Sequence, residues 1–173
     1  MDIATHQRAL LKLFRSDCDQ SACADDYICR VAQSRDLQEA KRNILLWRIY
    51  VLERTAPLTV NLLKQRGQLA AEVASFIARC NISPFRETQA PAFLEGLSES
   101  SNTLTRSVAQ FELALLRVRE GDCGRYVVCW DVEPHSVLHS LATNAVLPGA
   151  IPVGAYQVVV SRDFPDRLQI FSV

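Results

Sequence analysis

Two long segments space their apolar residues at helical intervals and contain neither glycine nor proline, which constrains the fold more than any other feature. In residues 36–54 the apolar positions recur three and four apart, and the same spacing runs through residues 103–119. This period matches an α-helix that buries one face. We therefore predict a long helix over each segment.

Shorter stretches with the same spacing complete a helical N-terminal part. Pro57 separates the first long helix from the next one, and Gly67 ends that next helix because glycine suits the residue after a helix. The remaining expected helices cover residues 3–15, 58–63 and 68–80, with a short helical turn at 93–97. Polar or proline-containing stretches predict loops at residues 16–26 and 81–91.

The pattern of residue types changes after about residue 120, from helical apolar spacing to stretches of strand-forming residues. Residues 126–130, 156–160 and 168–173 are rich in β-branched and aromatic side chains, which predicts three strands. Pro134 suits the first turn of a helix over 134–145. A turn at 163–166 joins the last two strands into a hairpin. The expected fold class is α+β, with a helical domain over 1–120 and a small, mainly antiparallel strand–helix–hairpin domain over 121–173.

The charge and composition favour a globular protein with protein or peptide partners. The chain has 173 residues, of which 49% are hydrophobic, and its 19 basic residues balance 19 acidic ones. This hydrophobic content argues against disorder, and the neutral charge argues against nucleic-acid or anionic-membrane binding. The sequence starts without a signal-peptide pattern and has no apolar run of membrane-spanning length. We expect a cytoplasmic protein with reduced cysteines.

The clustered cysteines do not form a recognisable metal pattern. Cys18, Cys23 and Cys29 are separated by four and five residues, whereas structural zinc sites more often use pairs two to four apart. Solvent-facing or packed thiols are the simpler interpretation. Cys123 and Cys129 flank a predicted strand, and the sequence has no Cys-x-x-Cys motif for a thioredoxin-like role.

The histidines and glycines also nominate no active site. His135 and His139 are four apart on an expected helix, but Ser136 occupies the position where a zincin has glutamate. Surface or helix-capping histidines are the simpler interpretation. No glycine-rich phosphate loop and no nucleophile elbow occurs. We therefore predict no catalytic residues and no metal or other cofactor in this chain.

A small open sheet has free edges, and an edge strand can accept an extended peptide as an additional strand. The alternative is that the sheet packs on the helices with its edge blocked. The sequence alone leaves both open.

Several motifs in the helical part resemble a known family. They are Arg48-Ile49-Tyr50-Val51-Leu52 with Ala56-Pro57-Leu58-Thr59 and Leu62-Leu63; Phe76-Ile77, Pro84-Phe85 and Phe93-Leu94; and residues 108–115, Val-Ala-Gln-Phe-Glu-Leu-Ala-Leu. Their order over residues 36–118 resembles the helical domain of the partner proteins of multinuclear non-heme iron oxidative enzymes. The later strand–helix–hairpin is similar in order to the C-terminal peptide-recognition region of such partners, as in methanobactin biosynthesis.

The resemblance implies a function without catalysis by this chain. In that family the partner pairs with an iron-dependent TIM-barrel oxidase and recruits a ribosomally made precursor peptide, whose cysteine is then modified. The iron belongs to the oxidase. Within the family the chain most resembles the partner in 3-thiaglutamate biosynthesis, where the pair excises the β-carbon of a C-terminal peptidyl cysteine.

The resemblance also suggests positions for the two interfaces. The strand positions expected closest to the peptide are Tyr126, Val128 and Trp130, or Tyr156, Val158 and Val160, because a bound peptide would extend the sheet. Which side chains face it depends on strand parity, which the sequence leaves open. Polar contacts with the oxidase are expected from Arg48, Arg54 and Glu112, which could equally be ordinary helix-surface charges.

Two other functions remain as alternatives. Part of the family carries a DNA-binding label, so the chain could be a DNA-binding regulator, although its neutral charge argues against this. It could also be a stand-alone metal or redox protein that uses its cysteines.

Overall fold

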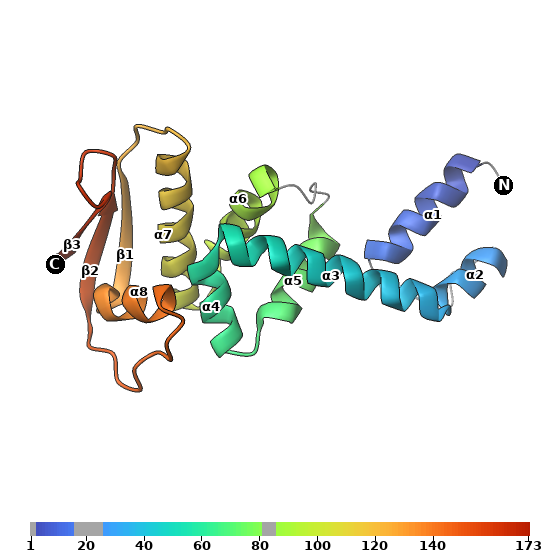
Figure 1. Ribbon diagram of the computed structural model, residues 1–173, viewed down its shortest axis with the longest axis horizontal. Helices are drawn as coiled ribbons and strands as arrows, with labels where there is room; N and C mark the ends of the chain where they lie inside the picture. The colour runs from blue at the N-terminus through green and yellow to red at the C-terminus, as the bar shows by residue number, and fades with distance from the viewer. Residues whose placement is uncertain (1–2, 16–25, 81–85) are drawn as a thin grey trace. The chain divides into compact units, whose positions relative to one another are not determined.

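The computed structural model describes residues 3–15, 26–80 and 86–173, and it confirms the α+β fold class (Figure 1). The elements in chain order are α1 (Ile3–Arg15), α2 (Asp26–Ala32), α3 (Arg35–Thr55), α4 (Pro57–Gln65), α5 (Leu69–Arg79), α6 (Arg86–Leu97), α7 (Thr103–Arg119), β1 (Tyr126–Val132), α8 (Pro134–Ala142), β2 (Val153–Val160) and β3 (Leu168–Ser172). Of the helices in these ranges, none has the length and apolar character needed to cross a bilayer.

The two long helices form where the apolar spacing predicts them, as α3 and α7. Asn102 caps α7, because its side chain accepts a hydrogen bond from the backbone N–H of Thr105. Pro57 separates α3 from α4 as expected, although α4 begins at Pro57 itself and extends to Gln65, and Gly67 follows it with a positive φ of 67°. The three strands and the β2–β3 hairpin are also where the sequence indicates.

Two segments differ from the expectation. We predicted a loop up to residue 91, but α6 is continuous from Arg86 to Leu97 with Pro91 inside it. Proline removes one helical hydrogen bond, whereas burial of Ala90, Phe93 and Leu94 stabilises the helix. The short helix α2 was not predicted, and most of the loop expected at residues 16–26 lies outside the described residues.

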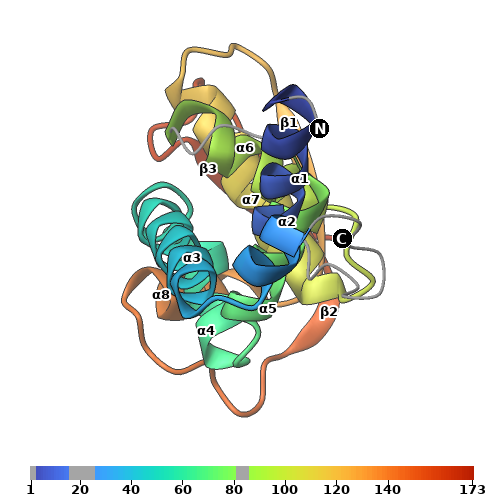
Figure 2. The ribbon, with the colours of Figure 1, turned by 90° about the vertical axis from the view of Figure 1, so that its right-hand side faces the viewer.

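The chain divides into two compact units. Of the described residues, the first unit contains 3–15, 26–50 and 70–80, and the second contains 51–69 and 86–173. In the first unit α1 and α2 lie side by side (Figure 2). Their buried cluster is small and consists of Leu13, Ile28 and Leu37.

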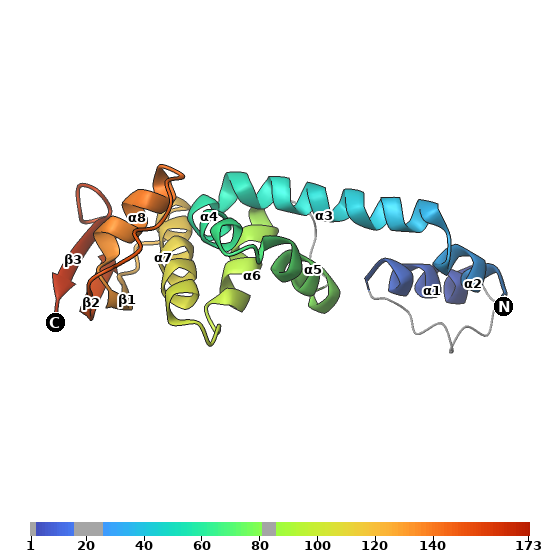
Figure 3. The same cartoon turned by 90° about the horizontal axis from the view of Figure 1, so that it is seen from below.

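The second unit contains the sheet and the larger core. Its strands have the order β1-β2-β3, and both pairings are antiparallel. Helices α7 and α8 lie on the same side of the sheet (Figure 3). The buried core combines this side of the sheet with α4, α7 and α8: Leu62, Val108, Phe111, Ala114, Val118, Val128, Trp130, Val137, Leu141, Val158 and Val160. Helices on the N-terminal side of residue 120 thus share one core with the sheet, while the domain boundary at residue 120 stays a prediction.

Candidate functional site

The β1 edge of the sheet exposes backbone hydrogen-bonding groups. In an antiparallel sheet, successive residues direct their N–H and C=O groups alternately to either side of the strand. The Cys129 carbonyl accepts a hydrogen bond of 2.8 Å from Ser107 Oγ on α7, so the odd-numbered residues of β1 direct these groups away from β2. Val127 therefore presents both its N–H and its C=O at the edge, where no group of the described chain bonds to them.

A groove of about 290 Å³ runs beside this edge, between α7 and β1. Its lining comes from α7, the start of β1 and the turn after α6: Ser98, Gln110, Leu113, Ala114, Arg117, Tyr126, Val127 and Val128. Gln110, Ala114 and Arg117 recur along α7 at helical spacing from Ser107, so one stripe of this helix follows the strand edge. The Val127 side chain is 55% exposed.

A polar network lies at the Tyr126 end of the groove. Arg117 Nη2 is 2.9 Å from Glu95 Oε1, and the Arg117 guanidinium lies 5.8 Å from the centre of the Tyr126 ring. The Tyr126 hydroxyl donates a hydrogen bond to Asp122. This bond lowers the pKa of Asp122 and raises the pKa of Tyr126. The network therefore fixes the Tyr126 ring at the end of the groove.

The β3 edge is the other free edge of the sheet. Two hydrogen bonds show which residues of β3 direct their backbone groups at β2. Ser161 N–H donates to the Arg167 carbonyl, and Val173 N–H donates to the Ala155 carbonyl. Odd-numbered residues of β3 thus face β2, and Ser172 directs its backbone groups outward. This strand has five residues, against seven in β1.

The strand positions expected nearest a peptide all belong to the inner face of the sheet. Four of them, Val128, Trp130, Val158 and Val160, are buried against the helices, and Tyr126 and Tyr156 are partly buried against the same core. The four buried side chains face away from solvent. Even-numbered residues of β1 direct their backbone groups at β2, and β2 is the central strand, so none of the six positions has backbone groups at a free edge. Only Tyr126 and Val128 of the six also line the groove. Their role in peptide binding stays a prediction.

The sequence reasoning missed the residues that shape this edge, namely Ser107, Gln110, Arg117 and Val127. A signal for the first three was present, because they lie three or four residues apart in a strongly predicted helix. Val127 gave no signal, because it stands among other strand-forming residues.

The three expected interface residues lie in different environments. Arg54 is exposed, and Arg48 is partly buried, which lowers its pKa by desolvation. Glu112, in contrast, is only 4% exposed. Its Oε1 and Oε2 accept hydrogen bonds of 2.8 Å from the backbone N–H groups of Leu58 and Thr59. Its carboxylate is therefore directed at α4 inside the second unit rather than at the surface.

Glu112 supplies the N-terminal cap that α4 lacks locally. Ala56, at the N-cap position, has no side chain that can accept a hydrogen bond. Burial raises the pKa of Glu112 from 4.5 to about 7, against the opposing effect of the Thr59 and Leu58 backbone hydrogen bonds and of Arg119. The hydrogen bonds of Glu112 therefore link α7, which lines one side of the groove, to the start of α4.

The cysteines and histidines converge on no metal-binding arrangement in the described ranges. Cys18 and Cys23 lie outside these ranges, and Cys29 is partly buried in α2. Cys123 and Cys129 are exposed free thiols. The His135 and His139 rings stack at 6.5 Å on α8, where Glu133 caps the helix by accepting from the N–H groups of His135 and Ser136.

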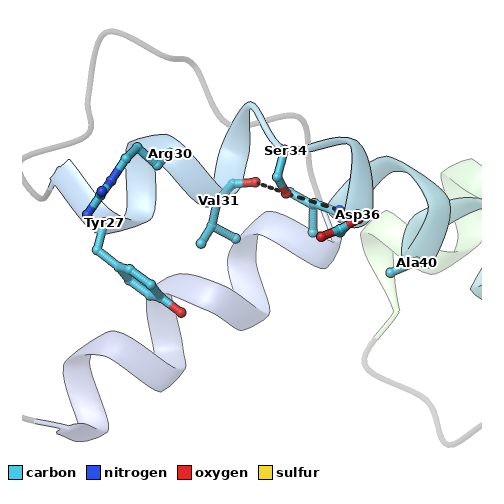
Figure 4. Close-up of a pocket in the computed structure, with 7 residues that line it drawn as sticks. Tyr27, Arg30, Val31, Ser34, Asp36 and Ala40 are labelled. Carbon is cyan, nitrogen blue, oxygen red and sulfur yellow. Dashed lines mark hydrogen bonds between the residues drawn. The ribbon is translucent and has the colours of Figure 1, made fainter.

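A second hollow, of about 520 Å³, lies in the first unit at the junction of α2 and α3 (Figure 4). Tyr27, Val31 and Ala40 contribute to its mainly apolar lining. The Ser34 hydroxyl shapes the junction, since it donates to the Val31 carbonyl and accepts from the Leu37 N–H. The β1 edge is the stronger candidate site because its groove lies beside unpaired backbone groups.

No family model matches the chain, and no curated protein matches its sequence. The functional interpretation therefore depends on the geometry of the edge and on the motifs in the sequence.

Proposed function

We propose that this chain is a non-catalytic partner subunit that binds a ribosomally made precursor peptide as an added strand at the β1 edge. The observation that carries the proposal is the combination of outward N–H and C=O groups at Val127 with a groove alongside. Such groups are complemented by a ligand that has backbone donors and acceptors of its own. An extended peptide supplies both, and its alternate side chains would enter the groove.

The β1 edge is favoured over the β3 edge for this role. It is the longer strand, and α7 flanks it with a groove whose lining includes both apolar and polar side chains. The backbone would provide affinity and the groove selectivity.

The proposed partner is a multinuclear non-heme iron oxidase, in keeping with the motif resemblance over residues 36–118. The iron and the chemistry belong to that oxidase, and this chain holds the peptide so that its cysteine meets the iron site. Tethering of this kind raises the effective concentration of the reacting group to the millimolar range or above. The proposed reaction is excision of the β-carbon from a C-terminal peptidyl cysteine, as in 3-thiaglutamate biosynthesis.

The decisive experiment is co-expression of the chain with a multinuclear non-heme iron oxidase and a short peptide that ends in cysteine. We expect a stable heterodimer by size-exclusion chromatography, and modification of the peptide by mass spectrometry only when both subunits are present. A chain that forms no complex with the oxidase and leaves peptide modification unchanged would overturn the proposal.

A matched pair of proline variants tests the edge. Val127→Pro removes an N–H that points away from β2, so the β1–β2 pairing keeps its hydrogen bonds. Ser172→Pro makes the same change at the β3 edge. We expect the first variant to lower peptide affinity at least about tenfold and the second to leave it unchanged. The reverse result would move the peptide to β3.

A further inference from the structure

The β1 edge is not equally open along its length. The Ser107 side chain is nearly fully buried, and its Oγ donates a hydrogen bond of 2.8 Å to the Cys129 carbonyl. A serine within a helix commonly bonds a carbonyl in the preceding turn of its own helix. Here the hydroxyl instead reaches a strand 22 residues along the chain.

This bond changes what the edge can offer a ligand. Val127 presents a donor and an acceptor that makes no other bond, whereas the Cys129 carbonyl already accepts from Ser107 and has one lone pair left for a ligand. A regular antiparallel ladder needs both groups at every second residue. The pairing of an added strand is therefore complete at Val127 and weaker at Cys129, where the peptide must share the carbonyl with Ser107.

We propose that Ser107 ends the pairing of a docked peptide at Cys129 and so sets its register, an inference that rests on the proposed function. The paired part of the peptide is then a short segment centred opposite Val127. Ser107 is a positioning residue, because it acts on the peptide through the Cys129 carbonyl.

The register specifies which peptide side chains contact the groove and which face solvent. A residue opposite Val127 has its side chain on the outer face with that of Val127, where solvent accommodates many side chains. Its two neighbours, opposite Tyr126 and Val128, point to the inner side, into the groove over Leu113 and Ala114. At about 290 Å³ the groove is slightly smaller than the usual ligand site of roughly 300–1,000 Å³. It therefore suits two small or medium apolar side chains that flank a variable position.

The test measures how peptide affinity depends on peptide length. Binders are selected from a phage-displayed library of random peptides on the wild-type chain and are then synthesised with one residue added or removed at a time. Fluorescence polarisation gives their dissociation constants. For the wild type we expect affinity to stop rising once the peptide passes the residue opposite Cys129.

The Ser107→Ala variant frees the Cys129 carbonyl. We expect the longer peptides to bind it about threefold to tenfold more tightly than peptides that end opposite Cys129, the effect of one net hydrogen bond. Ser107→Thr keeps a hydroxyl and should restore the plateau. Thermal melts of the three proteins check that the fold is retained. A wild-type affinity that keeps rising, or a plateau that Ser107→Ala leaves in place, would overturn the inference.

The outcomes also separate this inference from the proposed function. If neither the library nor the cysteine-bearing peptide of the co-expression experiment yields a binder, both are overturned. If peptides bind and Val127→Pro abolishes binding, but the length dependence is the same in Ser107→Ala and wild type, only the role of Ser107 is wrong.

Discussion

The two faces of the small sheet are made by the same three strands, yet their environments differ. On the inner face Val128, Trp130 and Val158 are almost fully buried against α7 and α8. On the outer face Val127 is 55% exposed and Phe171 is 39% exposed, whereas Val159 on the central strand is only 3% exposed. The inner face therefore holds the second unit together, while the outer face and the β1 edge are available for binding. Substitutions on the two faces should separate stability from recognition.

The largest effect on the free energy of unfolding is expected for Trp130→Ala on the inner face. Trp130 is 1% exposed, and its ring packs edge-on against Phe111 at 6.4 Å. Removing the ring leaves a cavity in the core, so the free energy of unfolding should fall by about 3–5 kcal/mol. Urea unfolding followed by circular dichroism measures the change. Cys129→Ala, the next residue on the outward-facing side, is the matched control, and an equal loss in that variant would contradict the division into two faces.

The next largest effect concerns Glu112, on the helix that packs beneath the inner face. Its pKa of about 7 exceeds the ordinary 4.5, so between these values the folded protein keeps a proton that the unfolded chain has lost. The free energy of unfolding should therefore fall as pH rises through this window, by up to about 1.4 kcal/mol per pH unit, and level off above it. Urea unfolding at several pH values measures the slope.

Glu112→Gln is the control for this slope, since glutamine does not titrate but can still accept a hydrogen bond from the start of α4. The other ionisable groups are the same in both proteins, so the difference between their pH profiles isolates Glu112. Identical profiles for the two proteins would show that its proton affinity is not raised by folding.

The division between the faces could not be predicted from the sequence, for a physical reason. The segments Tyr-Val-Val-Cys-Trp at 126–130 and Val-Val-Val at 158–160 are apolar at consecutive positions, so they lack the alternation that reveals a half-buried strand. Which residues of a strand face the core follows only from the pairing of the strands, for example Val128 opposite Val158. By contrast, the helical spacing in α3 and α7 is local and strong, and the sequence predicts both helices within about a residue of their observed ends.

The missed features depend on contacts between distant residues. Glu112 reads as a surface charge on a helix until its contacts with Leu58 and Thr59, more than fifty residues earlier in the chain, are known. The Ser107 contact with Cys129 likewise joins two elements whose relative placement no local pattern specifies. The expected loop before residue 91 became part of α6 because buried side chains outweighed the preference of Pro91.

A smaller effect is expected for Tyr126→Phe, at the end of the groove. The substitution removes the hydrogen bond that lowers the pKa of Asp122, so that pKa should rise towards its ordinary value. Because folding lowers this pKa, the bond stabilises the protein above the ordinary pKa of aspartate, and its contribution disappears as pH falls through the lowered value. A ¹³C NMR titration of the Asp122 carboxyl measures the shift. An unchanged Asp122 titration would show that the hydroxyl contact does not persist in solution.

The smallest effect is expected for Val127→Thr on the outer face. The side chain is largely exposed, and threonine suits a strand as well as valine does, so the free energy of unfolding should change by no more than about 0.5 kcal/mol. Threonine also keeps the outward N–H that Val127→Pro removes. The two variants at one position therefore separate the side chain from the backbone. A loss of stability similar to that in Trp130→Ala would mean that the outer face is packed, whereas unchanged stability and peptide affinity would assign recognition at this position to the backbone of β1.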